Sequence, residues 1–285
     1  MSLLFDRVTI VGAGLLGASL GLALQATGAA RHVVGVGRRQ ESLDTALRVG
    51  AITEGSLDLA TAVSQSDLIV IATPAGTVIP TIDQVRIACP EGAIVIDVAS
   101  TKAAICIHAE NTWPTPRRFI GCHPMAGSEK SGPENAIATL YNNSVCLIET
   151  HNDIDPDALA RVRQLWEAVG AHTLAIDPAT HDTILAQTSH VPHILSTILA
   201  TTAAECEATQ AFVGNGFRDM TRIAAGNPEM WRDITQTNRA AIANGLVAVK
   251  DQLDLFLAAL AAGDGSTLAD LFEAGKAARE KVLSE

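Results

Sequence analysis

Short apolar runs alternate with segments of helical spacing over the first 177 residues of the chain. Runs of this kind, bounded by glycine, proline and polar residues, are typical of buried parallel strands joined by helices. Strands are predicted at residues 7–11, 32–36, 67–72, 93–97, 118–121, 144–148 and 171–176. The pattern therefore predicts an α/β domain with a doubly wound, mostly parallel sheet.

Only helical spacing continues after Asp177, where we place a boundary between a domain of residues 1–177 and a domain of residues 178–285. Helices are predicted from 179 to about 207, at 217–225, from 228 to 262 and at 266–283. The third is long for a single globular domain. Its apolar stripe consists of Ile234, Ile242, Leu246, Val249, Leu253 and Leu257. Such a stripe would promote aggregation of a monomer, so we expect a homodimer through this helical domain.

A glycine-rich turn follows the first predicted strand and precedes a helix; it reads Gly12-Ala13-Gly14-Leu15-Leu16-Gly17. In this context the glycines are typical of a dinucleotide-binding loop in a Rossmann domain, although a bare tight turn is the alternative. Gly12 allows the turn, Gly14 lets the backbone approach a pyrophosphate, and Gly17 lets the helix pack on the strand. We assign the whole turn to the cofactor site, together with Thr73 and Pro74 after a later strand.

The end of the second predicted strand is where NAD-binding proteins usually place an acidic residue on the ribose. This chain has Gly37, Arg38 and Arg39 there. With no carboxylate and two guanidinium groups, the pocket suits the 2′-phosphate of NADP. We expect NADP to be preferred and NAD to be accepted more weakly. The alternative is that both arginines are only solvated surface residues.

Charge and composition limit the classes of partner. The formal net charge is −11 and no basic run is present, which argues against nucleic acid or an anionic membrane as partner. The cysteines are scattered, without a Cys-x-x-Cys pair, at positions 89, 106, 122, 146 and 206. This usage, with no signal-peptide pattern and no span-length apolar run, favours a cytoplasmic protein. A small anionic substrate would then need a local cationic pocket.

The segment from Gly121 to Ser128 is rich in turn residues and is predicted to be a loop after a short strand. A histidine in such a loop, here His123, can meet a ligand at the carboxyl edge of the sheet. The alternative is that its ring only stabilises a turn. Earlier in the chain, Ser100 precedes a helix predicted from Ala103, and it can either cap that helix or face the cofactor.

Two polar clusters lie in the predicted helical domain. The first contains His190 and His193, three residues apart and separated by Pro192, so we expect them where a helix begins or bends. A metal site that also uses His181 and Asp182 is the less favoured alternative, and we expect no metal. The second cluster contains Arg218 and Arg222, followed by Trp231. Arg222 is the best candidate to hold a carboxylate, with Arg218 next, unless one pairs with Asp219 or Asp233.

Five motifs together resemble those of prephenate and arogenate dehydrogenases. They are the glycine loop, Asp97-Val-Ala-Ser100-x-Lys102, Gly121-x-His123-Pro-Met-Ala-Gly127, Ser189-His190-x-Pro-His193 and Phe217-x-Asp219-x-Thr-Arg222. The match covers nearly the whole chain, and the combination of the two histidine motifs is highly specific. The resemblance implies a Rossmann domain, an all-helical dimerisation domain, and an active site in the cleft between them. The glycine at position 37 departs from the NAD-using pattern, in which an aspartate is expected.

The resemblance also implies roles for individual residues. His123 would accept a hydrogen bond from the ring hydroxyl of the substrate, and Ser100 would bridge towards the nicotinamide. The residues expected at the substrate are Ser128, His190, His193, Arg218, Arg222 and Trp231. The implied reaction transfers a hydride to NAD(P)⁺, with His123 as the base, before carbon dioxide leaves and the ring becomes aromatic.

Two other functions remain open at this point. A β-hydroxyacid dehydrogenase would use a lysine base in the second domain, but the lysines there, Lys250, Lys276 and Lys281, lie in late helices away from both clusters. A non-catalytic nucleotide sensor would need the glycine loop without the histidines and Arg222 together. The sequence does not separate prephenate from arogenate, which differ in a keto or an amino group on the side chain.

Overall fold

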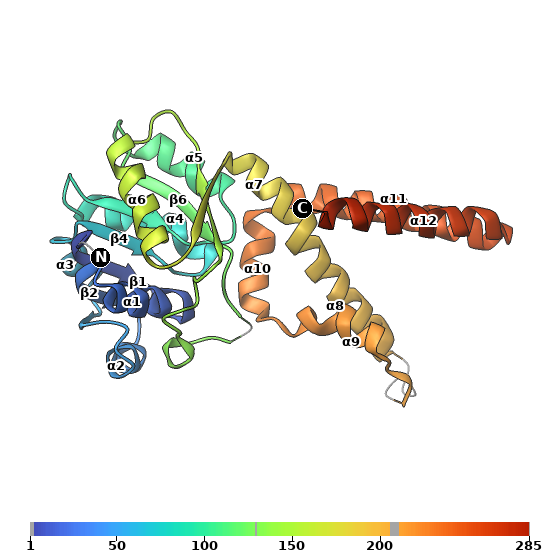
Figure 1. Cartoon of the computed structure of the whole chain (residues 1–285), viewed down its shortest axis with the longest axis horizontal. Coiled ribbons are helices and arrows are strands. Elements are labelled where there is room, and N and C mark those ends of the chain that lie inside the picture. Colours follow the sequence, from blue (N-terminus) through green and yellow to red (C-terminus); the bar gives the residue numbers. More distant parts are fainter. Residues whose placement is uncertain (1–2, 129, 206–210, 285) are drawn as a thin grey trace. The chain divides into compact units, whose positions relative to one another are not determined.

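The computed structural model describes residues 3–128, 130–205 and 211–284. The chain divides into two compact units, Met1–Asn238 and Arg239–Glu285. Two sequence-based assignments, the cysteine at 206 and the end of a helix near 207, lie outside the described residues. Figure 1 shows the chain coloured along its sequence.

The first unit is built on a single eight-stranded sheet with the order β3-β2-β1-β4-β5-β6-β7-β8. Its strands are β1 (Phe5–Val11), β2 (Ala30–Val36), β3 (Glu54–Ser56), β4 (Leu68–Ile71), β5 (Ile94–Asp97), β6 (Phe119–Pro124), β7 (Val145–Glu149) and β8 (His172–Ile176). All neighbours are parallel except β6 and β7. The predicted doubly wound, mostly parallel sheet is confirmed, and only the three-residue β3 was missed.

Helices cover both faces of this sheet (Figure 1). One layer contains α1 (Leu15–Thr27), α2 (Gln40–Arg48) and α6 (Pro156–Ala168), and the other contains α3 (Leu59–Val63), α4 (Ala75–Ala88) and α5 (Ala103–Thr112). Alternate residues of a strand point to opposite faces, so Leu68 and Val70 of β4 pack in the first core while Ile69 and Ile71 pack in the second. This double burial explains the uninterrupted apolar runs of the sequence.

All elements after β8 are helical within the described residues. The first unit continues through α7 (Pro178–Leu185), the π-helical turn η2 (Ala186–His190), α8 (Val191–Ala204), α9 (Asn215–Thr221), the 3₁₀ turn η4 (Arg222–Ala225) and α10 (Pro228–Thr237). The π-helical turn ends two residues before Pro192, which lies in the first turn of α8, where a missing backbone donor is tolerated. The prediction that His190 and His193 lie where a helix begins or bends is therefore confirmed.

The prediction of one helix from residue 228 to residue 262 is wrong. Asn238 leaves helical geometry between α10 and α11 (Arg239–Ala262). The amide nitrogen of Asn238 donates to the backbone oxygen of Asp182 at 2.7 Å, and this residue is 5% exposed. Buried polar contacts of this kind compensate for the lost helical hydrogen bond, whereas apolar periodicity gives no sign of them.

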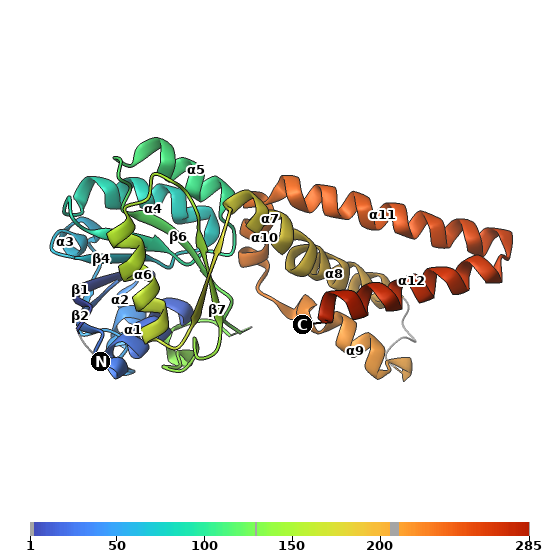
Figure 2. The ribbon, with the colours of Figure 1, turned by 45° about the horizontal axis from the view of Figure 1, so that its top comes forward.

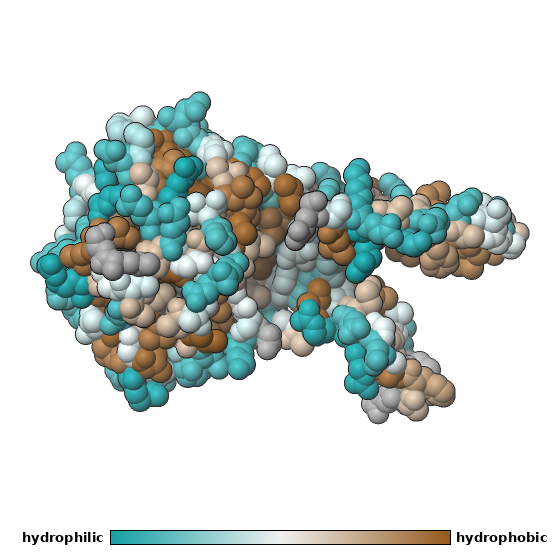
Figure 3. Space-filling view, viewed as in Figure 1, coloured by the Kyte–Doolittle hydropathy of each residue, from teal (hydrophilic) through white to brown (hydrophobic). Residues whose placement is uncertain are grey.

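The second unit is a pair of helices, α11 and α12 (Gly265–Leu283), which meet at the turn that joins them (Figure 2), with the rings of Phe256 and Phe272 in contact. Asp264 accepts from the backbone of Thr267 and caps α12. Large apolar side chains are exposed along the pair, including Val247, Leu253, Leu257, Leu260 and Phe272. Apolar surface is visible along these helices in Figure 3. No helix among the described residues is long and apolar enough to cross a membrane.

Candidate active site

The glycine turn between β1 and α1 has the close contacts that its sequence predicted. Gly12 has φ +101°, and a Cβ there would lie 2.6 Å from the carbonyl oxygen of Ala72. A Cβ on Gly17 would overlap the carbonyl oxygen of Gly12 and would lie 2.8 Å from a methyl group of Ile10. At Gly14, by contrast, a Cβ would meet no atom within 4 Å. The turn is thus closed on the sheet side and open over Gly14, where the first turn of α1 begins.

The residues around this turn fit a dinucleotide. Leu15 and Leu16 form the start of α1, where backbone N–H groups lack intrahelical partners and attract phosphate. Thr73 follows β4 beside Gly12, and its hydroxyl oxygen is buried without a hydrogen-bond partner among the described residues. Pro74 caps α4 with an extended backbone. An open backbone cradle and a buried hydroxyl group without a partner are both features that a bound nucleotide would complete.

The end of β2 presents two exposed arginines, Arg38 and Arg39, and neither forms an ion pair within the described residues. Gly37 does not have a positive φ, but a Cβ there would lie 3.2 Å from the side chain of buried Leu43. A side chain at this position would therefore require a small shift of Leu43.

His123 lies within β6 and not in a loop, which corrects the sequence prediction. The strand extends to Pro124 because β7 runs antiparallel beside it, with His123 opposite Leu147. The backbone N–H of Met125 still donates to Val145, at 2.7 Å. The side chain of His123 is consequently fixed at the carboxyl edge of the sheet and is only 8% exposed. Because β1 and β6 point the same way in the sheet, the glycine turn and His123 lie at one edge.

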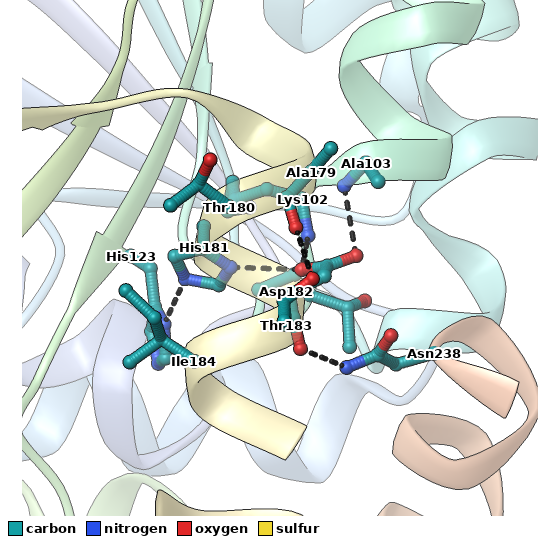
Figure 4. A network of polar contacts seen from close by, with 12 residues as sticks. Lys102, Ala103, His123, Ala179, Thr180, His181, Asp182, Thr183, Ile184 and Asn238 are labelled. Carbon is teal, nitrogen blue, oxygen red and sulfur yellow. Dashed lines mark hydrogen bonds and ion pairs between the residues drawn. The ribbon is translucent and has the colours of Figure 1, made fainter. Parts of the chain in front are cut away.

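A chain of three polar side chains begins at His123 (Figure 4). Nδ1 of His123 is 2.8 Å from Nε2 of His181, and Nδ1 of His181 is 2.8 Å from Oδ1 of Asp182. All three side chains are buried. Burial, and then the nearby charge of Lys102, holds the pKa of His123 well below its ordinary value of 6.5, so this imidazole is neutral near pH 7.

Asp182 also holds the start of α5 (Figure 4). Its Oδ1 accepts from the backbone N–H of Lys102 at 2.7 Å, and its Oδ2 accepts from that of Ala103 at 2.9 Å. Asp182 therefore caps the start of α5. The alternative that Ser100 caps this helix is wrong. Lys102 turns its ammonium group back to buried Asp97, which also accepts from the backbone of Ala99. The loop that carries Ser100 is thus held at both ends.

Asn238 extends the polar contacts to His190. The amide nitrogen of Asn238 is 3.2 Å from Nδ1 of His190, besides its bond to the backbone of Asp182. His190 is 2% exposed, and burial lowers its pKa to about 4, although Asp182 opposes the shift. Two of the predicted site histidines, His123 and His190, are therefore neutral and joined through one network.

His193 packs against Trp231, with ring centroids 3.5 Å apart and nearly parallel planes. The ring of His190 meets the same indole edge-on at 6.2 Å. Gly226 leaves room for this stack, since a Cβ there would lie 2.5 Å from the indole nitrogen. Nδ1 of His193 and the hydroxyl oxygen of Ser196 are buried without hydrogen-bond partners in the described part of the chain. Burial also lowers the pKa of His193.

The structure does not bring the two arginines into this network. Arg218 and Arg222 are exposed, and neither forms an ion pair in the ranges that the structure describes. Asp233, one of the partners considered for them, pairs with Arg232 at 2.7 Å. Arg222 is the first residue of η4, and η4 packs against α8, the helix that carries His193. Ser128 is also exposed and accepts from the backbone of Lys130 at 3.2 Å.

Three residues of the site were missed or misassigned from sequence. His181 and Asp182 were considered only as possible metal ligands, whereas no group of three or more His, Cys, Asp and Glu side chains in the described residues could hold a metal. Asn238 was placed inside a helix without comment. Its poor helix propensity within an apolar-periodic segment was the available signal for a break.

Two family models match consecutive parts of the chain. Residues 20–175 match the prephenate dehydrogenase nucleotide-binding domain, and residues 177–274 match the prephenate dehydrogenase dimerization domain. A prephenate dehydrogenase of Bacillus subtilis is 30% identical over 247 residues, which are 85% of this chain and 67% of that protein.

Two solved structures are also similar along almost the full chain. The prephenate dehydrogenase from A. aeolicus, in complex with hydroxyphenyl propionate and NAD⁺, has a TM-score of 0.88 at 28% identity and 99% coverage of both chains. The Synechocystis arogenate dehydrogenase has a TM-score of 0.82 at 29% identity, with 97% of this chain and 100% of that chain covered. With both domains matched in order, the chain belongs to the prephenate dehydrogenase family.

Proposed function

We propose that this chain catalyses the NAD(P)-linked oxidative decarboxylation of prephenate to 4-hydroxyphenylpyruvate, or of arogenate to tyrosine, in tyrosine biosynthesis. Membership of the family supports the reaction class. The observation that carries the proposal is the buried His123, in contact with His181 and at the same sheet edge as the glycine turn. The similar proteins are named for different substrates, prephenate and arogenate, and therefore leave that choice open.

The reaction needs a base, a hydride acceptor and an anion-binding surface. The substrate is a cyclohexadienol that carries a carboxylate on its ring. Bound at the glycine turn, NAD(P)⁺ supplies the hydride acceptor. His123 takes the hydroxyl proton, which a neutral imidazole can do near pH 7. The dienone that results loses carbon dioxide and becomes aromatic, and aromatisation supplies the driving force.

The remaining assignments concern substrate and cofactor contacts. Ser100 would lie between His123 and the nicotinamide, on the loop held by Asp97 and Asp182. Substrate contacts are proposed for Ser128, His190, His193, Arg218, Arg222 and Trp231. Either arginine, being exposed and unpaired among the described residues, is available to a substrate carboxylate.

One assay tests the function and the substrate together. The purified chain is supplied with prephenate or arogenate, each with NAD⁺ or NADP⁺, and reduced nicotinamide is followed by its near-ultraviolet absorbance. We expect turnover of at least one substrate with release of carbon dioxide. Absence of turnover in all four combinations would refute the proposal and would favour a nucleotide sensor. Turnover of a β-hydroxyacid instead would favour the other dehydrogenase class.

We further propose that NADP is preferred over NAD. The support is the pair of exposed arginines that follow Gly37 at the end of β2, where NAD-binding proteins usually carry an acidic residue. Replacing both Arg38 and Arg39 by alanine should lower kcat/KM for NADP⁺ by about 10–100-fold and leave that for NAD⁺ nearly unchanged. Arg48→Ala, at the exposed end of α2, is the matched control.

A wild-type preference for NAD⁺ of about tenfold or more would contradict the assignment of these arginines. Gly37→Asp is not a clean test of this assignment. Its Cβ would press on Leu43, so a loss of activity could come from packing.

We also propose a homodimer through the helical domain, with the domain boundary near residue 177. The boundary between the two matched family domains supports this division, and the exposed apolar side chains of α11 and α12 support a partner subunit. Sedimentation at micromolar concentration should give a dimer. A stable and active monomer would contradict the proposal.

A further inference from the structure

Hydrogen-bond direction in the chain His123–His181–Asp182 is fixed at one end. A carboxylate only accepts, and Asp182 already accepts from two backbone N–H groups at the start of α5. His181 must therefore donate from Nδ1, which lies 2.8 Å from Oδ1 of Asp182. In a neutral imidazole the other nitrogen is then an acceptor.

The same logic passes to His123. If His181 is neutral, its Nε2 accepts, and Nδ1 of His123 is then the donor across their 2.8 Å contact. In that case the proton of neutral His123 resides on Nδ1, and Nε2 keeps its lone pair. In free histidine the proton resides mostly on Nε2, so the contact selects the less common tautomer. A protonated His181 would donate from both nitrogens and would force His123 into the opposite, base-incompetent tautomer.

We propose that His181 and Asp182 are positioning residues that hold His123 in the Nδ1–H tautomer, so that Nε2 is the atom that accepts the substrate's proton. This inference rests on the proposed function for its chemical role, but the tautomer itself is a property of the free protein. When the base acts, the hydroxyl O–H bond breaks and a bond from Nε2 to hydrogen forms. The Nδ1–H bond is kept and continues to donate to His181.

Asp182 acts on a second part of the site at the same time. Its carboxylate joins α7 to the first two residues at the start of α5, and the loop just before them carries Ser100. One side chain thus sets both the orientation of the base and the placement of the neighbouring hydroxyl. Preorganised hydrogen bonds of this kind act on the chemical step more than on substrate binding.

The direct test is ¹⁵N NMR of the full-length chain labelled at its histidine rings. His123 signals are assigned by their loss in His123→Asn. At neutral pH we expect the shift of a protonated nitrogen at Nδ1 and of an unprotonated nitrogen at Nε2. In His181→Leu, which removes the acceptor, both shifts should move towards the values of free histidine. A proton on Nε2 of wild-type His123 would overturn the inference.

Kinetics supply the second test. His181→Leu should lower kcat by about 10²-fold, within the range of general-base contributions, while KM changes little. His181→Gln keeps an acceptor oxygen for His123 and should recover most of the loss. Asp182→Asn should resemble His181→Leu. Asp177→Asn is the matched control, because Asp177 caps the same helix from an exposed position and should leave kcat unchanged.

The outcomes separate the inference from the function. If the wild-type chain turns over neither substrate, the proposed function fails and the NMR result still decides the tautomer. If it is active and His181→Gln is as impaired as His181→Leu, with both folded by circular dichroism, the positioning role is refuted while the function stands.

Discussion

The two sides of the candidate site differ in how their polar groups are paired. On the side that we call the sheet side, His123 of β6 is joined by hydrogen bonds to His181 and Asp182 of α7, and all three side chains are buried. On the side of α8, Nδ1 of His193 and the hydroxyl of Ser196 are buried without partners among the described residues. The nearby arginines of α9 and η4 are exposed and also unpaired there.

This contrast has a physical reason under the proposed function. Groups that perform chemistry work best when their orientation is fixed before the substrate arrives. Groups that bind a ligand instead need free hydrogen-bonding capacity, and an unsatisfied buried polar group costs about 1–3 kcal/mol in the folded protein. We therefore expect the sheet side to control kcat. The helical side, which is formed by α8, α9 and η4, is expected to control KM and part of the stability.

The largest effect is expected on the sheet side. His123→Asn should lower kcat by about 10²–10⁴-fold, because it removes the base, while cofactor affinity stays near the wild-type value. Steady-state kinetics and nucleotide titration measure the two quantities. His172→Asn, at an exposed position of β8, is the control. A near-normal kcat in His123→Asn would remove this residue from its proposed role.

On the helical side, Arg222→Ala should mainly raise KM. Loss of a charge-assisted contact to a carboxylate costs about 1.5–3 kcal/mol, or roughly 10–100-fold in affinity. The same measurement on Arg218→Ala shows which arginine makes the contact. An unchanged KM in both variants would place the anion-binding group elsewhere, and a loss confined to kcat would erase the contrast between the two sides.

The smallest effect concerns stability and pH. The pKa of His190 is lowered from 6.5 to about 4 by burial, so the unfolded chain binds this proton more readily than the folded chain. The unfolding free energy is therefore little affected by this group above pH 6.5, and it decreases as the pH falls from 6.5 towards about 4. From pH 7.5 to pH 5 the wild type should lose about 1–2 kcal/mol more unfolding free energy than His190→Gln.

Chemical denaturation at both pH values measures that difference. Equal losses in wild type and His190→Gln would mean that His190 is protonated in the folded state, against its burial beside Asn238.

Local pattern was sufficient for most of the fold. The apolar runs and the glycine turn depend on neighbouring residues, and they predicted the sheet and the turn between β1 and α1. Local pattern failed where a partner distant in sequence decided the geometry. β7 extends β6 through His123, and Asn238 breaks a helix to reach Asp182, 56 residues earlier.

The sequence by itself thus determined the sheet, the order of the motifs and the family they resemble. Only the tertiary structure decided which polar groups meet, because those pairs are remote along the chain. His123 and His181 are 58 residues apart, and Asp182 is 80 residues from the backbone of Lys102 that it holds. Periodicity reports which face of an element is buried. It carries no information on the hydrogen-bond partner that a buried histidine or carboxylate will find, since that partner is fixed by the packing of whole elements.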